Sequence, residues 1–255
     1  MKLGIAIPES VTDQHLLGAA IDARPVKPDA VAVWAQGLVL DIEGVRALRA
    51  CGIQPLVYAQ TARWSAESIL SGQHDIDIDT LAMNLSVFAP DTIVRLNQEP
   101  NGPGLRADWN LWSPETFISV FRYISTRIHA IAPDVRMAYC IAWRGKDYAD
   151  DFRRWYPGNY ACQVVGFDAY VTSPIQRPSR IWPAAIRTIR ETTPSKPIWV
   201  MEAGVSRWVP FRGRRLREMR RVQGLAGIVL MDMRIEHYGK IHDWELNERL
   251  RRLWR

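Results

Sequence analysis

Two glutamates in distant parts of the chain stand at the ends of apolar runs, and a turn follows each. Residues 92–98 (Thr-Ile-Val-Arg-Leu-Asn-Gln) lead to Glu99, and Pro100-Asn101-Gly102 then breaks the run. Residues 197–201 (Pro-Ile-Trp-Val-Met) lead to Glu202, which is followed by Ala and Gly. Short β-branched runs of this kind predict buried strands, and Pro-Asn-Gly predicts a turn. Two carboxyl groups at strand ends are suited to paired acid–base chemistry, such as the hydrolysis of a glycosidic bond.

The first of these runs carries polar side chains at alternate positions. Side chains alternate between two faces along a strand, so we expect Arg95, Asn97 and Glu99 on one face. Val94 and Leu96 then lie on the other face. Burying a charged face is costly unless its groups find partners. We therefore expect the end of this strand to open into a polar site.

The chain as a whole alternates between strand and helix patterns. The predicted strands cover residues 3–7, 30–35, 53–58, 92–98, 135–143, 162–170, 197–201 and 227–231. The predicted helices lie near residues 15–21, 41–50, 64–70, 77–88, 114–128, 150–155, 179–191, 214–222 and 245–254. Such alternation implies parallel pairing, and eight units in about 250 residues match a (β/α)8 TIM barrel, here one domain over residues 1–255. A doubly wound open sheet is the alternative, but no GxGxxG follows the first strand.

In such a barrel the reactive side chains stand at the carboxyl ends of the strands. The sequence places carboxylates, amides and aromatic rings there. These groups can bind sugar hydroxyls and cover the apolar face of a pyranose ring. The candidates are Trp34, Tyr58, Gln60, Asn97, Gln98, Glu99, Trp143, Arg144, Asp168, Tyr170, Glu202 and Asp232.

The motif from Arg95 to Gly102 resembles the acid/base strand of glycoside hydrolase family 26, a group of clan A retaining enzymes that includes β-mannanases. The family pattern has Arg and then His-Glu-Met-Asn-Gly. Residues 69–82, 166–170 and 197–204 also resemble parts of this family, the last of them its nucleophile strand. Gln98 replaces the family's His and Pro100 its Met, which leaves the identity of the sugar open.

The resemblance implies a role for each matching residue. Glu99 would be the general acid/base and Glu202 the nucleophile. Glu99 must begin protonated beside an ionised Glu202, and the two carboxyl groups of a retaining enzyme lie about 5–5.5 Å apart, against about 6.5–9.5 Å in an inverting one. Tyr170 would hydrogen-bond Glu202, and Gln98 would hold a hydroxyl of the sugar being cleaved. Further substrate-binding candidates are a sugar platform of Trp34, Trp143 and Trp208, and Arg95, which would pair with a carboxylate or be structural.

The chain is basic, with a net charge of +6, and arginines cluster in residues 212–221 and 249–255. We expect these runs to be solvated helix faces, with binding of an anionic polymer as the alternative. Arg144, Arg207 and Arg212 lining the cleft would favour that alternative. We expect no cofactor or metal, because the three cysteines and five histidines form no CxxC or HExxH pattern. Cys140 and Cys162 are expected to be buried free thiols.

The sequence therefore predicts a monomeric, endo-acting, retaining glycoside hydrolase of a β-linked polysaccharide or oligosaccharide. A glycan-binding barrel without catalysis is one alternative, although it need not keep both Glu99 and Glu202. A hydrolase of an anionic bacterial exopolysaccharide or cell-wall glycan is another. We expect no nucleic-acid or membrane partner, because no apolar run is long enough to span a bilayer. Residues 1–8 are too short for a signal peptide, so a cytoplasmic location is the default expectation, although a glycan substrate would be extracellular.

Overall fold

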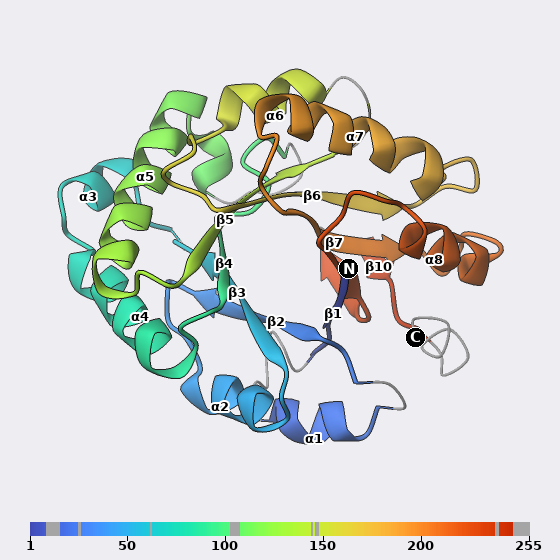
Figure 1. Cartoon of the computed structure of the whole chain (residues 1–255), viewed down its shortest axis with the longest axis horizontal. Helices are drawn as coiled ribbons and strands as arrows, with labels where there is room; N and C mark the ends of the chain where they lie inside the picture. Colours follow the sequence, from blue (N-terminus) through green and yellow to red (C-terminus); the bar gives the residue numbers. More distant parts are fainter. Residues whose placement is uncertain are drawn as a thin grey trace.

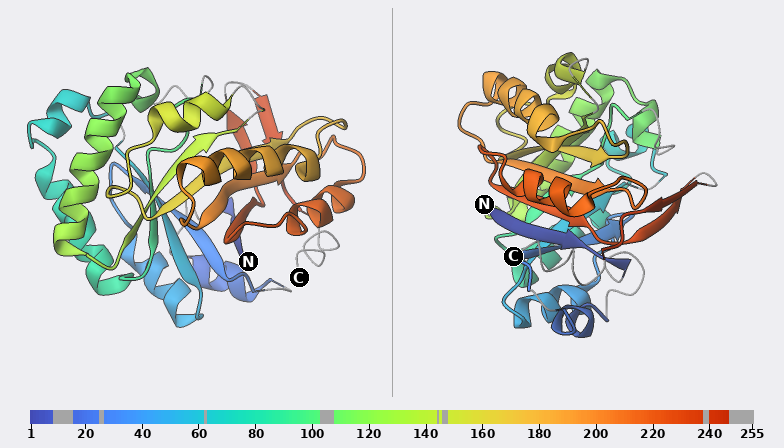
Figure 2. Two further views of the ribbon diagram at one scale, coloured as in Figure 1. Left: turned by 45° about the horizontal axis from the view of Figure 1, so that its top comes forward. Right: turned by 90° about the vertical axis from the view of Figure 1, so that its right-hand side faces the viewer.

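The computed structural model describes residues 1–8, 16–24, 27–61, 63–102, 108–143, 145, 148–237 and 240–246. Within these residues, eight parallel strands close a barrel in chain order and helices surround it (Figure 1 and Figure 2). The predicted (β/α)8 barrel is confirmed. Its strands are β1 (Lys2–Ala6), β2 (Ala30–Gln36), β3 (Gln54–Gln60), β4 (Ile93–Leu96), β5 (Arg136–Ala142), β6 (Val164–Val171), β7 (Ile198–Val205) and β8 (Gly227–Met231). Its helices are α1 (Leu17–Asp22), α2 (Ile42–Ala50), α3 (Ala66–Leu70), α4 (Asp75–Phe88), the 3-10 turn Asp108–Leu111, α5 (Pro114–Ile131), α6 (Ala149–Trp155), α7 (Pro178–Thr192) and α8 (Arg212–Arg220).

The helix starts follow local sequence signals. The Asp41 side chain caps α2 by accepting hydrogen bonds from the backbone N–H groups of Glu43 and Gly44. Ser113 caps α5 in the same way, and Pro114 occupies the first helical turn, where its missing N–H costs nothing. Both starts agree with the predicted boundaries. None of the described helices is long and apolar enough to cross a bilayer.

The strands are buried on both faces, as parallel strands are in this architecture. On β4, Ile93 and Arg95 point into the barrel, while Val94 and Leu96 point outward to the helix layer. The barrel interior is therefore apolar toward the amino ends of the strands and polar at their carboxyl ends. Cys140 and Cys162 are buried free thiols, as expected.

β7 contains one residue more than either of its neighbours at the same height. Its pairing to β6 passes from Val200 to Glu202 without Met201, and its pairing to β8 shifts at the same place. Such a bulge puts consecutive side chains on one face, and both Met201 and Glu202 point into the barrel. The Met201 carbonyl accepts a hydrogen bond from the Tyr58 hydroxyl across the interior. The side chain of Met201 has room because residue 166 is glycine, where a Cβ would lie 2.9 Å from Met201 Cγ.

The fourth strand is shorter than predicted. It ends at Leu96, and Asn97 and Glu99 follow in left-handed backbone conformations with φ of 43° and 50°. The Asn97 amide turns to Thr61 beyond β3, where its Oδ1 accepts from the Thr61 N–H at 3.0 Å. Arg95, Asn97 and Glu99 were predicted on one face of a strand. This alternation of side chains ends at Leu96, because the left-handed backbone at Asn97 and Glu99 turns the chain out of the extended conformation.

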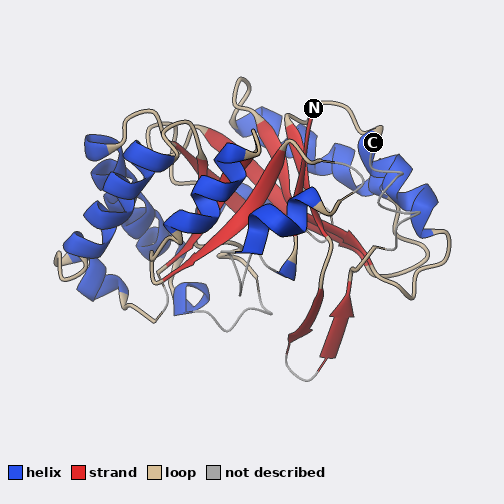
Figure 3. Ribbon diagram, turned by 90° about the horizontal axis from the view of Figure 1, so that it is seen from below, coloured by secondary structure: helices blue, strands red, loops and turns tan. Residues whose placement is uncertain are grey.

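A helix was predicted over residues 245–254, of which the structure describes only residues 245 and 246, and no element was predicted between that helix and β8. Two antiparallel strands, β9 (Arg234–His237) and β10 (Lys240–Asp243), form a hairpin that extends away from the barrel (Figure 3). Residues 244–246 then return to the barrel without helical structure, and residues 247–255 lie outside the described residues. The sequences Arg-Ile-Glu-His and Lys-Ile-His-Asp each carry one β-branched apolar residue among polar ones, too few to predict a strand from periodicity.

Candidate active site

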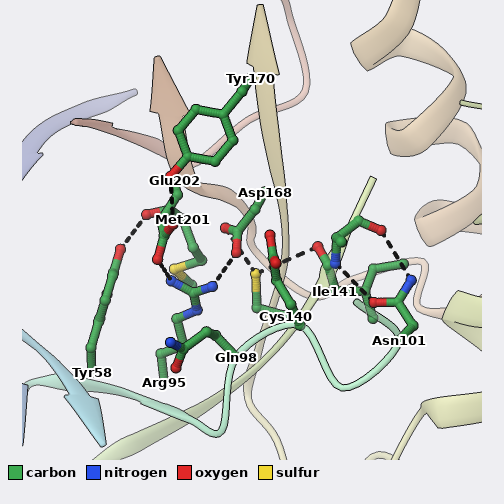
Figure 4. Close-up of polar contacts among 12 residues, drawn as sticks. Tyr58, Arg95, Gln98, Asn101, Cys140, Ile141, Asp168, Tyr170, Met201 and Glu202 are labelled. Carbon is green, nitrogen blue, oxygen red and sulfur yellow. Dashed lines mark hydrogen bonds and ion pairs between the residues drawn. The ribbon is translucent and has the colours of Figure 1, made fainter. Parts of the chain in front are cut away.

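Arg95 occupies the centre of the polar part of the barrel. Its Nη1 donates a hydrogen bond to Glu202 Oε1 at 2.5 Å, and its Nη2 pairs with Asp168 (Figure 4). The guanidinium lies over the ring of Tyr58, 4.6 Å from its centre. Burial opposes the charge of Arg95, but Asp168 and Glu202 among its neighbours raise its pKa above the ordinary value. One permanent cation therefore ties together carboxylates of β6 and β7.

The second oxygen of Glu202 is held by Tyr170 of β6. The Tyr170 hydroxyl donates to Glu202 Oε2 at 2.5 Å, as the resemblance implied (Figure 4). Burial raises the pKa of Tyr170, and the neighbouring charge of Glu202 raises it further, so the hydroxyl stays a donor. With a donor on each oxygen, the carboxylate of Glu202 is fixed in orientation and its negative charge is stabilised.

Asp168 lies beside this pair and is fully buried. The Cys140 thiol donates to Asp168 Oδ1 at 3.3 Å, while Arg95 binds the other oxygen. Burial raises the pKa of Asp168 well above its usual range. The charge of Arg95 lowers this pKa without cancelling the effect of burial, and the charges of Glu202 and Glu99 raise it further. We call Glu99, Asp168 and Glu202 the carboxyl cluster. Since the charge of Arg95 offsets only one of them, the member whose pKa is raised, Asp168, favours keeping its proton.

Glu99 stands in the turn after β4, at the same end of the barrel as Glu202, so the predicted placement of the two glutamates is confirmed. Its left-handed backbone is uncommon for a residue with a side chain and costs about 1 kcal/mol or more. The Glu99 N–H donates to the Cys140 carbonyl at 3.2 Å, and its carbonyl accepts from Gly102 at 2.8 Å and from Asn110 Nδ2 at 2.6 Å. These bonds on both sides hold the turn that presents the carboxyl group.

The other four predicted substrate-binding residues lie in four different places. Gln98 is half-buried, and its Oε1 is buried with no hydrogen-bond partner among the described residues. Trp34 lies inside the barrel with its ring edge against Tyr58, 4.8 Å between centres. Trp143 lies outside the barrel wall against Phe167, so the structure does not bring it to the site. Trp208 is exposed on the segment after β7.

Trp244 is a site neighbour that the sequence did not reveal. After the β9–β10 hairpin, its buried ring lies beside Tyr170, 4.6 Å between ring centres and tilted by 33°. It also covers Gly204, where a Cβ would lie 2.8 Å from the ring. The Leu246 N–H donates to Asp232, which anchors this return to the barrel. The ring therefore forms an aromatic wall next to the residue that holds Glu202.

Gly102 gives a first test of the site. A methyl group at this position would lie 3.0 Å from the Glu99 carbonyl oxygen and 3.3 Å from Oε2. Gly102→Ala should therefore displace the Glu99 carboxyl and lower turnover about tenfold or more for a poor leaving group that needs a proton. Turnover of an activated aryl glycoside should fall less. Gly18→Ala in α1 is the control, since its Cβ would meet only Ala47 at 3.4 Å; equal loss on both substrates would contradict the prediction.

Asp168 gives a second test, through the pH profile. Asp168→Asn removes one titrating member of the carboxyl cluster, so the proton on the remaining carboxyl groups should leave at a lower pH. We expect the alkaline limb of kcat/KM to move down by about one pH unit. Asp79→Asn, in the α4–α5 ion pairs with Arg127, is the control. An unchanged or upward-moving limb would show that Asp168 exerts no electrostatic effect on the titrating group.

Solved structures of family 26 mannanases share this fold. A modular endo-β-1,4-mannanase from Cellulomonas fimi matches with a TM-score of 0.71 and 12% identity, covering 97% of this chain and 67% of that one. The family 26 domain of an endo-β-mannanase/endo-β-glucanase from Prevotella bryantii matches with a TM-score of 0.72 and 10% identity, covering 98% and 87%. A β-mannanase from Bacteroides ovatus has a TM-score of 0.63 and 14% identity, covering 91% and 80%.

No protein-family model and no curated protein sequence matches the chain. At the low identities of the solved structures, the likeness is one of fold. The chain has the (β/α)8 barrel fold of the family 26 mannanases, the family that its strand-end motifs resemble.

Proposed function

We propose that the chain is a retaining, endo-acting glycoside hydrolase of a β-linked polysaccharide. The observation that supports the proposal is the pair of hydrogen bonds to Glu202: Arg95 binds one carboxylate oxygen and Tyr170 binds the other. Donors on both oxygens fix the direction of attack and stabilise negative charge, as a nucleophile requires, and the Glu202 side chain is 14% exposed, whereas Asp168, which also has two partners, is fully buried. Glu99 stands at the same end of the barrel, in a turn held by three hydrogen bonds.

In the first step, a Glu202 oxygen attacks the anomeric carbon while Glu99 gives its proton to the leaving glycosidic oxygen. The bond between the anomeric carbon and that oxygen breaks, and a glycosyl ester of Glu202 forms. In the second step, Glu99 takes a proton from water, the water oxygen attacks the anomeric carbon, and Glu202 leaves as a carboxylate. Arg95 and Tyr170 stabilise the negative charge that returns to Glu202 in this step. The mechanism requires the two carboxyl groups to be about 5–5.5 Å apart.

Sugar binding around the reacting bond falls to three groups of the described site. The unpartnered Gln98 Oε1 offers an acceptor for a sugar hydroxyl, which agrees with the role that the motif implies. Trp34 and Trp244 pack beside Tyr58 and Tyr170 and are nearly buried, so only the small exposed part of each ring is open to the apolar face of a sugar. Trp143 is left out because its ring belongs to the outer layer.

Product analysis on a panel of polysaccharides tests this function, with β-mannan, β-glucan and their acidic derivatives as the substrates. Glu202→Ala is the control for contaminating activity. We expect oligosaccharides of mixed length from at least one β-linked polymer, and newly formed reducing ends of retained configuration. Binding of a polymer without any product, at equal levels in the wild type and in Glu202→Ala, would indicate a glycan-binding barrel instead.

A further inference from the structure

Two aromatic side chains stand exposed on the segment between β7 and α8. Trp208 is 74% exposed and Phe211 is 79% exposed. The segment begins where β7 ends, at Val205, three residues and about 10 Å beyond Glu202 along the strand. The two rings therefore lie on the segment that leaves the end of the barrel carrying the carboxyl cluster.

The Trp208 ring is held in place rather than free on the surface. The Arg207 guanidinium lies over it, 4.4 Å from the ring. Arg207 Nη1 pairs with Asp243 at 2.9 Å, and the Arg207 N–H donates to the Asp243 carbonyl at 3.0 Å. Burial raises the pKa of Asp243, but the bonds from Arg207 and the Glu245 backbone outweigh it and lower that pKa overall. The carboxylate that anchors the stack is therefore ionised at neutral pH.

Phe211 is fixed by its backbone. Its φ is 58°, a left-handed conformation that costs an aromatic residue about 1 kcal/mol or more. The Arg214 N–H donates to the Phe211 carbonyl at 2.8 Å, so the first turn of α8 holds this conformation. Both rings are exposed on a backbone that is ordered before any ligand arrives, which lowers the entropy cost of binding.

The charge that this segment presents to solvent is positive. Arg207 is 48% exposed, while its partner Asp243 is 8% exposed. Arg214 is 64% exposed, while its partner Glu218 is 12% exposed and is shared with Arg177 and Arg215. The acids lie beneath the arginines, so a ligand above the rings meets the cations first.

We propose that Trp208, Phe211, Arg207 and Arg214 form a distal subsite for an acidic sugar, and that the polysaccharide cut at Glu202 carries carboxylate or sulfate groups. The inference rests on the proposed function and names its substrate class. The rings would cover sugar faces, and the guanidinium groups would bind the acidic groups, which arginine recognises with two parallel hydrogen bonds. A neutral glycan would use only the rings.

Binding to a matched pair of polymers tests this subsite. The probes are carboxymethyl and hydroxypropyl derivatives of the same galactomannan, measured by affinity electrophoresis with Glu202→Gln so that no probe is cut. We expect at least tenfold tighter binding of the carboxymethyl polymer, and a steep loss with added salt. Trp208→Ala, Arg207→Gln and Arg214→Gln should each weaken that binding about three- to tenfold, and less so for the hydroxypropyl polymer. A sulfated galactomannan run alongside shows which acidic group binds more tightly.

Two control substitutions match the variants in exposure. Tyr160→Ala removes an exposed aromatic ring elsewhere on the chain. Arg46→Gln removes an arginine that is 63% exposed and pairs with Glu43 at 3.4 Å, close to the 64% and 3.5 Å of Arg214 and Glu218. Asp243→Asn should weaken carboxymethyl binding in the same direction as Trp208→Ala, because it releases Arg207 from its anchor. Equal affinity for the two polymers, or equal losses in the two controls, would overturn the subsite.

The two proposals fail in different ways. If the wild type hydrolyses glycosides but treats both polymers alike, and Trp208→Ala changes nothing, the subsite is wrong and the proposed function stands. If no glycoside is hydrolysed but the carboxymethyl preference and its loss in Trp208→Ala are seen, the proposed function is wrong and the chain binds acidic glycans. Thermal unfolding of every variant shows that each one is folded.

Discussion

Replacing Glu202 by alanine should abolish turnover on every substrate, including aryl glycosides whose leaving group needs no proton. No other oxygen is held by both Arg95 and Tyr170 among the described residues, so nothing replaces the lost nucleophile. A nucleophile of this kind is worth about 10⁴-fold or more in kcat. The measurement is the initial rate of dinitrophenol release from a β-glycoside, with product analysis on the polysaccharide found to be cleaved.

Two further observations make this result interpretable. The Glu202→Ala protein should unfold at nearly the temperature of the wild type, because Arg95 keeps its buried partner Asp168. Tyr170→Phe should show a smaller loss, since one donor to Glu202 remains. More than about one per cent of wild-type turnover in a pure Glu202→Ala preparation would contradict the role of nucleophile, given the expected size of the effect.

The loss of turnover when Glu99 is replaced by alanine should depend on the leaving group of the substrate. With an activated phenol, the first step needs no proton, so the glycosyl ester of Glu202 should still form. With a sugar as the leaving group, turnover should fall about 10²- to 10⁴-fold, the usual contribution of a general acid. A burst of dinitrophenol followed by slow release is therefore the expected time course, because the second step also lacks its base.

The anomeric configuration of the product formed with azide distinguishes the roles of the two glutamates. A small anion fits the space left at residue 99 and needs no base, so it should accelerate breakdown of the ester in Glu99→Ala. The product should be a glycosyl azide of the same anomeric configuration as the substrate. Azide added to Glu202→Ala would attack directly and invert the configuration. An inverted azide from Glu99→Ala would show instead that the two residues have exchanged roles.

The fold could be predicted because its signals are local. A strand buried on both faces needs an unbroken apolar run, and the last strand of the barrel, β8 (Gly227–Met231), was predicted at its observed bounds. Helix starts such as Ser113-Pro114 depend on four or five neighbouring residues. The β9–β10 hairpin and the position of Trp244 could not be predicted, for the opposite reason. The two strands pair only with each other, and Trp244 is placed by contact with residues distant in sequence.

The carboxyl groups of the site and the residues that bind them could be predicted, but their geometry and the aromatic neighbours were not: Trp143 lies outside the barrel wall and Trp244 was missed. Glu202, Tyr170 and Arg95 were identified by residue type and position, and the structure shows the contacts between them. The partner of Asp168, by contrast, depends on β5 and β4 meeting at one height. For Trp143 a signal did exist: Cys140 points inward, so three residues later the alternation of β5 points outward.

The extra residue of β7 has a consequence for how the enzyme can diverge. Both neighbouring strands register the insertion at the same height, so neither ladder can absorb it by slipping. Deleting Met201 would restore the regular alternation with Glu202 still facing the lumen, but it would remove the carbonyl that accepts the hydrogen bond from Tyr58. Loops at the rim can lengthen, shorten or change charge, and new substrates can be recruited that way. The height and direction of Glu202 cannot drift with them, so the chemistry is inherited as a unit while specificity is free to vary.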